Sequence, residues 1–149
     1  MALSTTQSIW RSGGGDQTRT AYCGSGVMAA QFYIADASVA TATNVTVSNG
    51  GPALILPAGA VVLSVAINDA GAGSVDLGTR GYTSGTVTGA AIANNLSVAS
   101  AGVVTSGLTL TAISAMSYVT VTIDTSGSGT VGGYITYFVV DPQAGQQND

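Results

Sequence analysis

Apolar residues alternate with polar or small residues over short stretches of this chain, beginning near residue 27. In the run VMAAQFYI, which ends at Ile34, the side chains of Met28, Ala30, Phe32 and Ile34 share one face and are all apolar. A period of two is typical of a strand that buries one face. The pattern therefore predicts a half-buried strand over residues 27 to 34.

Two further alternating runs lie between Ile55 and Tyr82, on either side of a loop of small residues. One face of the first run, residues 60 to 68, carries Val61, Leu63, Val65 and Ile67. The second run places Val75 and Leu77 on one face, and Pro57 with Gly59 marks a turn before the first run. We expect the two runs to pair as a β-hairpin, with residues 69 to 73 as its loop.

The same kind of segment recurs along the rest of the chain. Short strands are predicted over residues 44–47, 85–93, 96–99, 108–113, 118–124 and 130–140. Glycine-rich and asparagine-rich turns separate them, including a turn expected at Asn94-Asn95. Eight to ten short strands without a helical period predict an all-β fold, an antiparallel β-sandwich of jelly-roll or Greek-key type.

The two ends of the chain differ from this middle part. Residues 1–26 are rich in Ser, Thr, Gly and Gln and predict an extended N-terminal arm, whereas residues 141–149 predict a polar tail. Residues 27–140 would form the β-sandwich domain. A chain of 149 residues fits one domain that buries roughly 70% of its unfolded surface.

Composition strengthens the all-β prediction. The charged residues are three Arg and seven Asp, with no Lys, Glu or His, and the net charge is −4. Helix surfaces usually carry Glu and Lys, whereas Ser, Thr, Asn and Gly favour strands and turns. A surface with so few charges is also weakly protected against association, so we expect partners to cover much of it.

The same composition argues against several classes of function. Acid-base catalysis commonly uses His, Glu or Lys, so we expect no enzyme and no cofactor. Three Arg in an acidic chain do not make a nucleic-acid interface, and no apolar run reaches the roughly 20 residues of a membrane span. The first residues do not resemble a secretory signal, and the single Cys23 cannot form an intramolecular disulfide.

One loop offers oxygen ligands of the kind that calcium takes. Asn68, Asp69, Ser74 and Asp76 surround it, but the acidic alternation and closing Glu of a calcium motif are absent. Our interpretation is that these residues shape a turn and solvate a strand, so that no metal is predicted. A calcium-requiring lectin or enzyme is the alternative for this loop.

The arm contains the residues that a folded domain explains least. Trp10 either packs on the chain's own sheet or anchors a partner, and Trp, Tyr and Arg are the types enriched at interface hot spots. The predicted partner-binding residues are Ile9, Trp10, Arg11, Arg19 and Tyr22.

The run LPAGAVVLSVAINDAGAGSVDLGT, residues 56–79, resembles head decoration (cement) proteins and related head-fibre proteins of tailed bacteriophages. The similarity covers about Ala53 to Thr79: a Leu-Pro-x-Gly turn, an alternating strand, a loop of small residues and a strand ending in Asp-x-Gly. It implies a β-sandwich, usually a homotrimer, bound to the major capsid protein on the outside of a virion and made in the host cytoplasm. It implies no catalytic residues.

A receptor- or glycan-binding fibre domain is the alternative function. Sugar sites commonly place an exposed aromatic ring beside Asp, Asn or Arg. Tyr82, two residues after Arg80, is the best candidate for such a site in the sequence.

Overall fold

The computed structural model describes residues 26–36, 41–71, 73–125 and 129–140, and these form strands and loops without a helix. The strands are β1 (Met28–Ile34), β2 (Thr43–Asn44), β3 (Ile55–Leu56), β4 (Ala60–Asp69), β5 (Ser74–Gly81), β6 (Val87–Ser97), β7 (Gly102–Val104), β8 (Ser117–Thr125) and β9 (Val131–Val139). Neither the predicted arm nor the predicted tail, apart from Gly26, lies within the described residues.

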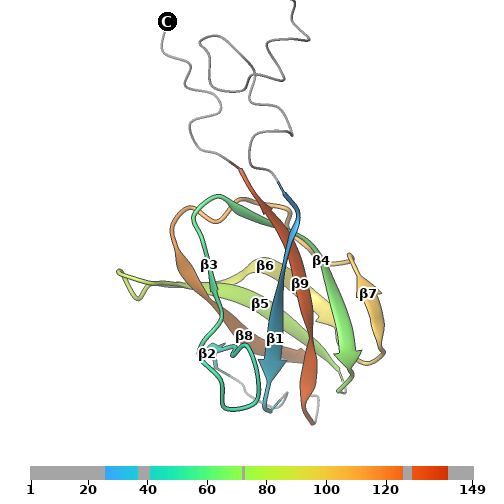
Figure 1. Cartoon of the computed structure of the whole chain (residues 1–149). Helices are drawn as coiled ribbons and strands as arrows, with labels where there is room; N and C mark the ends of the chain where they lie inside the picture. The colour runs from blue at the N-terminus through green and yellow to red at the C-terminus, as the bar shows by residue number, and fades with distance from the viewer. Residues whose placement is uncertain (1–25, 37–40, 72, 126–128, 141–149) are drawn as a thin grey trace, which may run out of the picture.

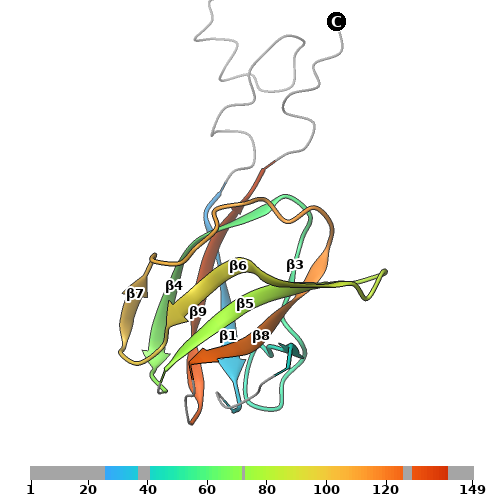
Figure 2. The same cartoon turned by 180° about the vertical axis from the view of Figure 1, so that it is seen from behind.

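The strands form two antiparallel sheets that lie one behind the other (Figures 1 and 2). One sheet, sheet A, has the order β1-β9-β4-β7, and the other, sheet B, has the order β2-β8-β5-β6, with β3 also paired to β8. This confirms the prediction of an all-β, antiparallel fold. The arrangement is sandwich-like, because side chains from both sheets share one hydrophobic core.

The order of pairing follows a nested rule along the chain. The first strand pairs with the last, β2 and β3 pair with β8, β4 pairs with β7, and β5 pairs with its successor β6. The first half of the chain therefore runs antiparallel to the second half, as in one long folded-over hairpin. Two further pairs, β4 with β9 and β5 with β8, join these couples into the sheets.

The core lies between the sheets and is built mainly from aliphatic side chains. Its largest fully buried members are Phe32 on β1, Leu56, Leu77, Leu96 and Ile135 on β9. The predicted inward faces are confirmed at Phe32 and Ile34 of β1 and at Val75 and Leu77 of β5, which are at most 3% exposed. Met28, on the same predicted face of β1, is instead 38% exposed. Alternation therefore identified the core side of both strands but not where the buried part of β1 begins.

The predicted hairpin of residues 60 to 78 is wrong. Strand β4 pairs with β7 and β9 in sheet A, whereas β5 pairs with β6 and β8 in sheet B. The short loop after Asp69 crosses from one sheet to the other. Because both strands bury an alternating apolar face, they can meet either side by side or face to face across the core, and the pattern alone does not separate these cases.

The inward face of β4 also differs from the prediction in its first half. A register shift between Val62 and Ser64 leaves Leu63 as an extra residue opposite β9. Such a bulge exchanges the two faces of a strand. Val62 therefore belongs to the core together with Val65, whereas Leu63 is only half-buried.

Two further local predictions need correction. The Asn94-Asn95 pair does not end a strand, because β6 continues through it with a register shift and with Asn95 at φ = +55°. Residues 108–113 are not a strand: only Leu108 forms an isolated bridge, to Ala93. Beyond Thr109 the chain leaves the sheet edge, and the pocket described below lies where it departs.

Candidate functional site

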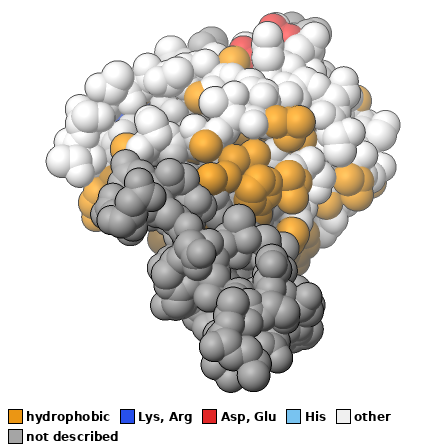
Figure 3. Space-filling model, turned by 90° about the horizontal axis from the view of Figure 1, so that it is seen from above, with side chains coloured by type: hydrophobic (Ala, Val, Ile, Leu, Met, Phe, Trp, Pro, Cys, Tyr) orange, Lys and Arg blue, Asp and Glu red, His pale blue; other side chains and the backbone are white. Residues whose placement is uncertain are grey.

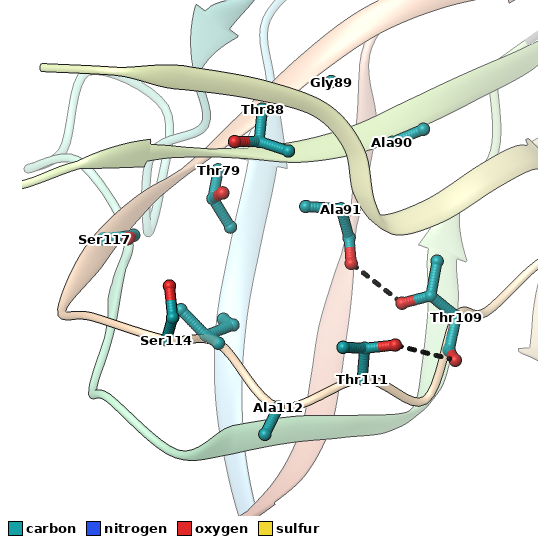
Figure 4. A pocket seen from close by; sticks show the side chains of 11 residues that line it. Thr79, Thr88, Gly89, Ala90, Ala91, Thr109, Thr111, Ala112, Ser114 and Ser117 are labelled. Carbon is teal, nitrogen blue, oxygen red and sulfur yellow. Dashed lines mark hydrogen bonds between the residues drawn. The ribbon is translucent and has the colours of Figure 1, made fainter.

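A pocket of about 400 Å³ lies between β6 of sheet B and the segment of residues 109–114 (Figure 4). Its lining consists of small and hydroxyl-bearing residues. The hydroxyl groups come from Thr79, Thr88, Thr109, Thr111, Ser114 and Ser117. Neither a charged side chain nor an aromatic ring belongs to this lining.

The pocket opens where two neighbouring segments diverge. The Thr109 amide donates to the Ile92 carbonyl at 3.0 Å, and the Thr109 hydroxyl donates to the Ala91 carbonyl at 2.8 Å. Four residues later, the Ile113 amide donates to the Ala60 carbonyl of sheet A at 2.9 Å. The segment therefore crosses from the edge of one sheet to the other and leaves a wedge beside β6.

A large bulge in β6 forms the opposite wall. Thr88 pairs with Thr79 and Ala93 pairs with Leu77, so residues 89–92 of β6 stand opposite the single residue Gly78. A side chain at Gly78 would collide with the Thr88 carbonyl oxygen. Glycine at this position therefore allows β6 to bulge over β5 and to present its backbone to the pocket.

Both walls contain a residue in the left-handed region. Ala90 on β6 has φ = +52°, and Leu110 in the facing segment has φ = +54°. This conformation is uncommon for residues other than Gly, Asn or Asp and costs of order 1–3 kcal/mol. Strained backbone of this kind clusters at binding sites.

Three of the six hydroxyl groups donate hydrogen bonds to backbone carbonyls near the pocket. Thr109 donates to Ala91, Thr111 donates to Thr109, and Ser117 donates to Ala115. In contrast, the hydroxyl groups of Thr79, Thr88 and Ser114 make no hydrogen bond with another described residue. Thr79 is 9% exposed, but within the described residues the buried side-chain oxygens without a partner are those of Asn44 and Thr120, so the Thr79 hydroxyl is open to water in the pocket.

A second surface feature lies on the outer face of sheet B. The rings of Tyr82 and Tyr118 have centroids 5.4 Å apart at 35°, and Ile55 stands directly opposite Tyr118 in the β3–β8 pair. Tyr82 is 49% exposed and Ile55 is 38% exposed. We call Ile55, Tyr82 and Tyr118 the tyrosine patch; it is an exposed apolar cluster of the type found at protein interfaces.

The sugar site considered for Tyr82 and Arg80 is only partly assembled. The Arg80 guanidinium donates through Nη2 to the Ala42 carbonyl at 2.9 Å, and Arg80 faces Tyr118 in the β5–β8 register. Arg80 therefore ties β5 to the segment before β2. Tyr82 instead has an aromatic neighbour, Tyr118, which is distant from it in the sequence.

The oxygen-rich loop uses its polar groups within the fold. Asp69 accepts a hydrogen bond from the Thr130 hydroxyl at 3.1 Å, whereas Asp76 accepts one from the Asn95 amide at 2.8 Å. The two carboxylates thus accept hydrogen bonds from different parts of the fold, Asp69 from the residue before β9 and Asp76 from β6. In the part of the chain that the structure describes, no group of three His, Cys, Asp or Glu side chains is placed to hold a metal ion.

The predicted partner-binding residues of the arm, Ile9, Trp10, Arg11, Arg19 and Tyr22, lie outside the described residues. The pocket was not predicted at all. Its hydroxyl residues are common throughout the sequence, and neither Ala90 nor Leu110 is a residue type that signals a left-handed backbone.

No protein-family model, curated protein or solved structure matches this chain. Within the described ranges, no helix is long and apolar enough to cross a bilayer.

Proposed function

We propose that this chain is a structural virion protein that decorates and stabilises a bacteriophage capsid, and that its body is a jelly roll. The nested pairing of β1 with β9, β2 and β3 with β8, β4 with β7, and β5 with β6 is the observation that carries the proposal. It follows the order of a jelly roll, a fold that viral capsid proteins use. This support is an analogy at the level of fold, and the resemblance of residues 53–79 to decoration proteins adds to it.

The protein would bind on the outside of the capsid, across neighbouring major capsid protein subunits, as a homotrimer without catalytic activity. Stable protein interfaces bury about 1,600 Å² in total, and three linked copies multiply the effect of weak contacts. The tyrosine patch supplies exposed apolar area on the body. The arm, with Ile9, Trp10 and Arg11, would cross to capsid protein or to a sister subunit.

Co-sedimentation with empty capsids, assembled from the major capsid protein encoded in the same genome, tests this proposal. We expect saturable binding by the full chain, and loss of binding after deletion of residues 2–20. Tyr82→Ala should weaken binding about tenfold, which corresponds to 1.4 kcal/mol. Tyr134→Ala is the matched control, because Tyr134 is 42% exposed but lies on sheet A.

Two results would contradict the proposal. One is full-length protein that does not bind these capsids and has the native mass of a monomer. The other is binding that is unchanged by deletion of residues 2–20 and by Tyr82→Ala, because neither proposed attachment would then contribute.

Glycan binding is the second candidate function, and the exposed Tyr82 ring beside Tyr118 favours it. Aromatic faces are common platforms for sugars. A glycan array probed with the full chain and with Tyr82→Ala tests it. Sugar binding that is lost in Tyr82→Ala, without binding to capsids, would support this function over decoration.

A further inference from the structure

The wedge-shaped pocket between β6 and residues 109–114 is open to solvent and, at about 400 Å³, large enough to take a bulky side chain. We propose that it is the docking site of the chain's own N-terminal segment, residues 1–25, with the indole of Trp10 seated in it. The inference goes beyond the proposed function, since it concerns the free protein and does not depend on a capsid. Its arguments are the position, the chemistry and the backbone of the pocket.

The position of the pocket suits a segment that starts at Gly26. Met28 pairs with Tyr137 near the end of β9, and Val139 pairs with Ala60 at the start of β4. The Ala60 carbonyl in turn accepts a hydrogen bond from the amide of Ile113, a residue that lines the pocket. With neighbouring strands about 4.8 Å apart, these steps place Gly26 about 15 Å from Ile113.

The length of the segment is more than sufficient for this distance. Twenty-five residues can span up to about 80 Å when fully extended. A tether that is long enough but not excessive gives a high effective concentration of its far end, in the millimolar range.

Figure 3, which looks onto the end of the molecule where the described chain stops, shows apolar side chains gathered there. Val140, which is 41% exposed, lies at this end. Its amide donates a hydrogen bond to the Gly59 carbonyl, and the Gly59 amide donates one to the Ile113 carbonyl.

The chemistry of the pocket suits an uncharged segment with one large amphipathic side chain. Residues 1–25 are rich in Ser, Thr, Gly and Gln, and they contain the only tryptophan of the protein. An indole has a broad apolar ring and a single N–H that needs an acceptor when buried. The pocket offers apolar groups from Ala91 and Ile113 together with hydroxyl oxygens, among them that of Thr79, which is open to the pocket.

The backbone of the pocket offers the second kind of contact that an extended segment needs. No strand pairs with Gly89 or Ala90, which form the bulge at the edge of sheet B. Because the bulge interrupts the extended backbone here, Gly89 and Ala90 can offer single main-chain hydrogen bonds to a segment but not an edge for a whole added strand.

Trp10 itself provides the measurement, because its fluorescence reports only on the arm. In the full chain, without capsids, we expect its emission to be blue-shifted and several-fold less quenched by acrylamide than in a peptide of residues 1–25. Ser114→Phe and Thr88→Phe, which fill the pocket from its two walls (Figure 4), should restore the emission of the free peptide. Ser100→Phe, at an exposed bend away from the pocket, should not change it.

The outcomes separate this inference from the proposed function. Trp10 emission in the full chain equal to that of the peptide would overturn it, as would a blue shift that neither pocket variant removes while both keep the circular dichroism of the native fold. A blue shift that grows with protein concentration would indicate docking into a second copy and would overturn the intramolecular form. Capsid binding is tested in a different sample, so either idea can fail alone.

Discussion

Two threonine hydroxyl groups on opposite sheets differ in their hydrogen bonding. Thr120 on β8 is 1% exposed, and its Oγ1 has no partner. Thr136 on β9 shares a hydrogen bond of 2.6 Å with the Ser64 hydroxyl. A buried polar group without a partner costs about 1–3 kcal/mol, whereas a made hydrogen bond contributes about 1 kcal/mol.

Replacement of each threonine by valine should therefore change stability in opposite directions. Thr120→Val removes an unsatisfied hydroxyl and should raise the free energy of unfolding by about 1 kcal/mol. Thr136→Val leaves Ser64 without its partner and should lower that free energy by about 1 kcal/mol. Urea unfolding measures both, and an equal loss in the two variants would contradict this account of Thr120.

Alternation placed residues such as Phe32 and Leu77 on the correct faces of their strands, because a period of two is a local property of the chain. The pocket residues could not be found in this way. Thr79 and Ser114 are 35 positions apart in the sequence, and they line one pocket only because a distant segment folds over β6.

At the scale of the element, the bulge in β4 makes Leu63 contribute less to stability than the buried Leu77 of β5. Leu77 on β5 is 1% exposed and belongs to the core, whereas Leu63 is the extra residue of the bulge and is half-buried. Leu77→Ala should lower the free energy of unfolding by about 2–5 kcal/mol, the usual cost of a cavity at a buried leucine. Leu63→Ala should cost less than half as much, and thermal or urea unfolding measures the difference. Equal losses would mean that Leu63 lies inward, as alternation alone predicts.

Two adjacent glycines of β9 make a second comparison. A side chain at Gly133 would collide with the Ala66 carbonyl oxygen on β4, and Phe32 lies against the same position. At Gly132 the nearest atom would be the Asp69 Cβ at 3.6 Å, an ordinary contact. Gly133→Ala should therefore lower the free energy of unfolding by about 1–3 kcal/mol through overpacking, while Gly132→Ala should cost clearly less. Similar melting temperatures for the two variants would contradict the close approach of β4 and β9.

The predicted hairpin shows why strands were easier to locate than to pair. Residues 60–69 and 74–81 are both strands, as expected, but they belong to different sheets. Pairing depends on which other strands compete for each edge. Here β9 and β8, far away in the sequence, occupy the edges that a hairpin would have used.

For the whole molecule, the scarcity of charge predicts that its association depends little on salt concentration. The only basic side chain among the described residues is Arg80, and it is already bonded to the Ala42 carbonyl. Screening by salt weakens contacts between exposed charges but hardly affects apolar ones. Capsid binding or self-association should therefore change by less than about threefold between low and high salt, measured by co-sedimentation or sedimentation velocity. A steep loss at high salt would contradict this prediction and would mean that charged groups, such as Arg11 and Arg19 of the arm, contribute much of the binding.

The sequence by itself determined the fold class and the strands that supply most of the core, because alternation, turn residues and the lack of Glu and Lys are local or compositional properties. Only the tertiary structure decided which strands pair, that a bulge turns Leu63 away from the core, and that residues 109–114 leave the edge of sheet B to open a pocket. These features depend on contacts between residues distant in the sequence, whose free energy no local pattern encodes.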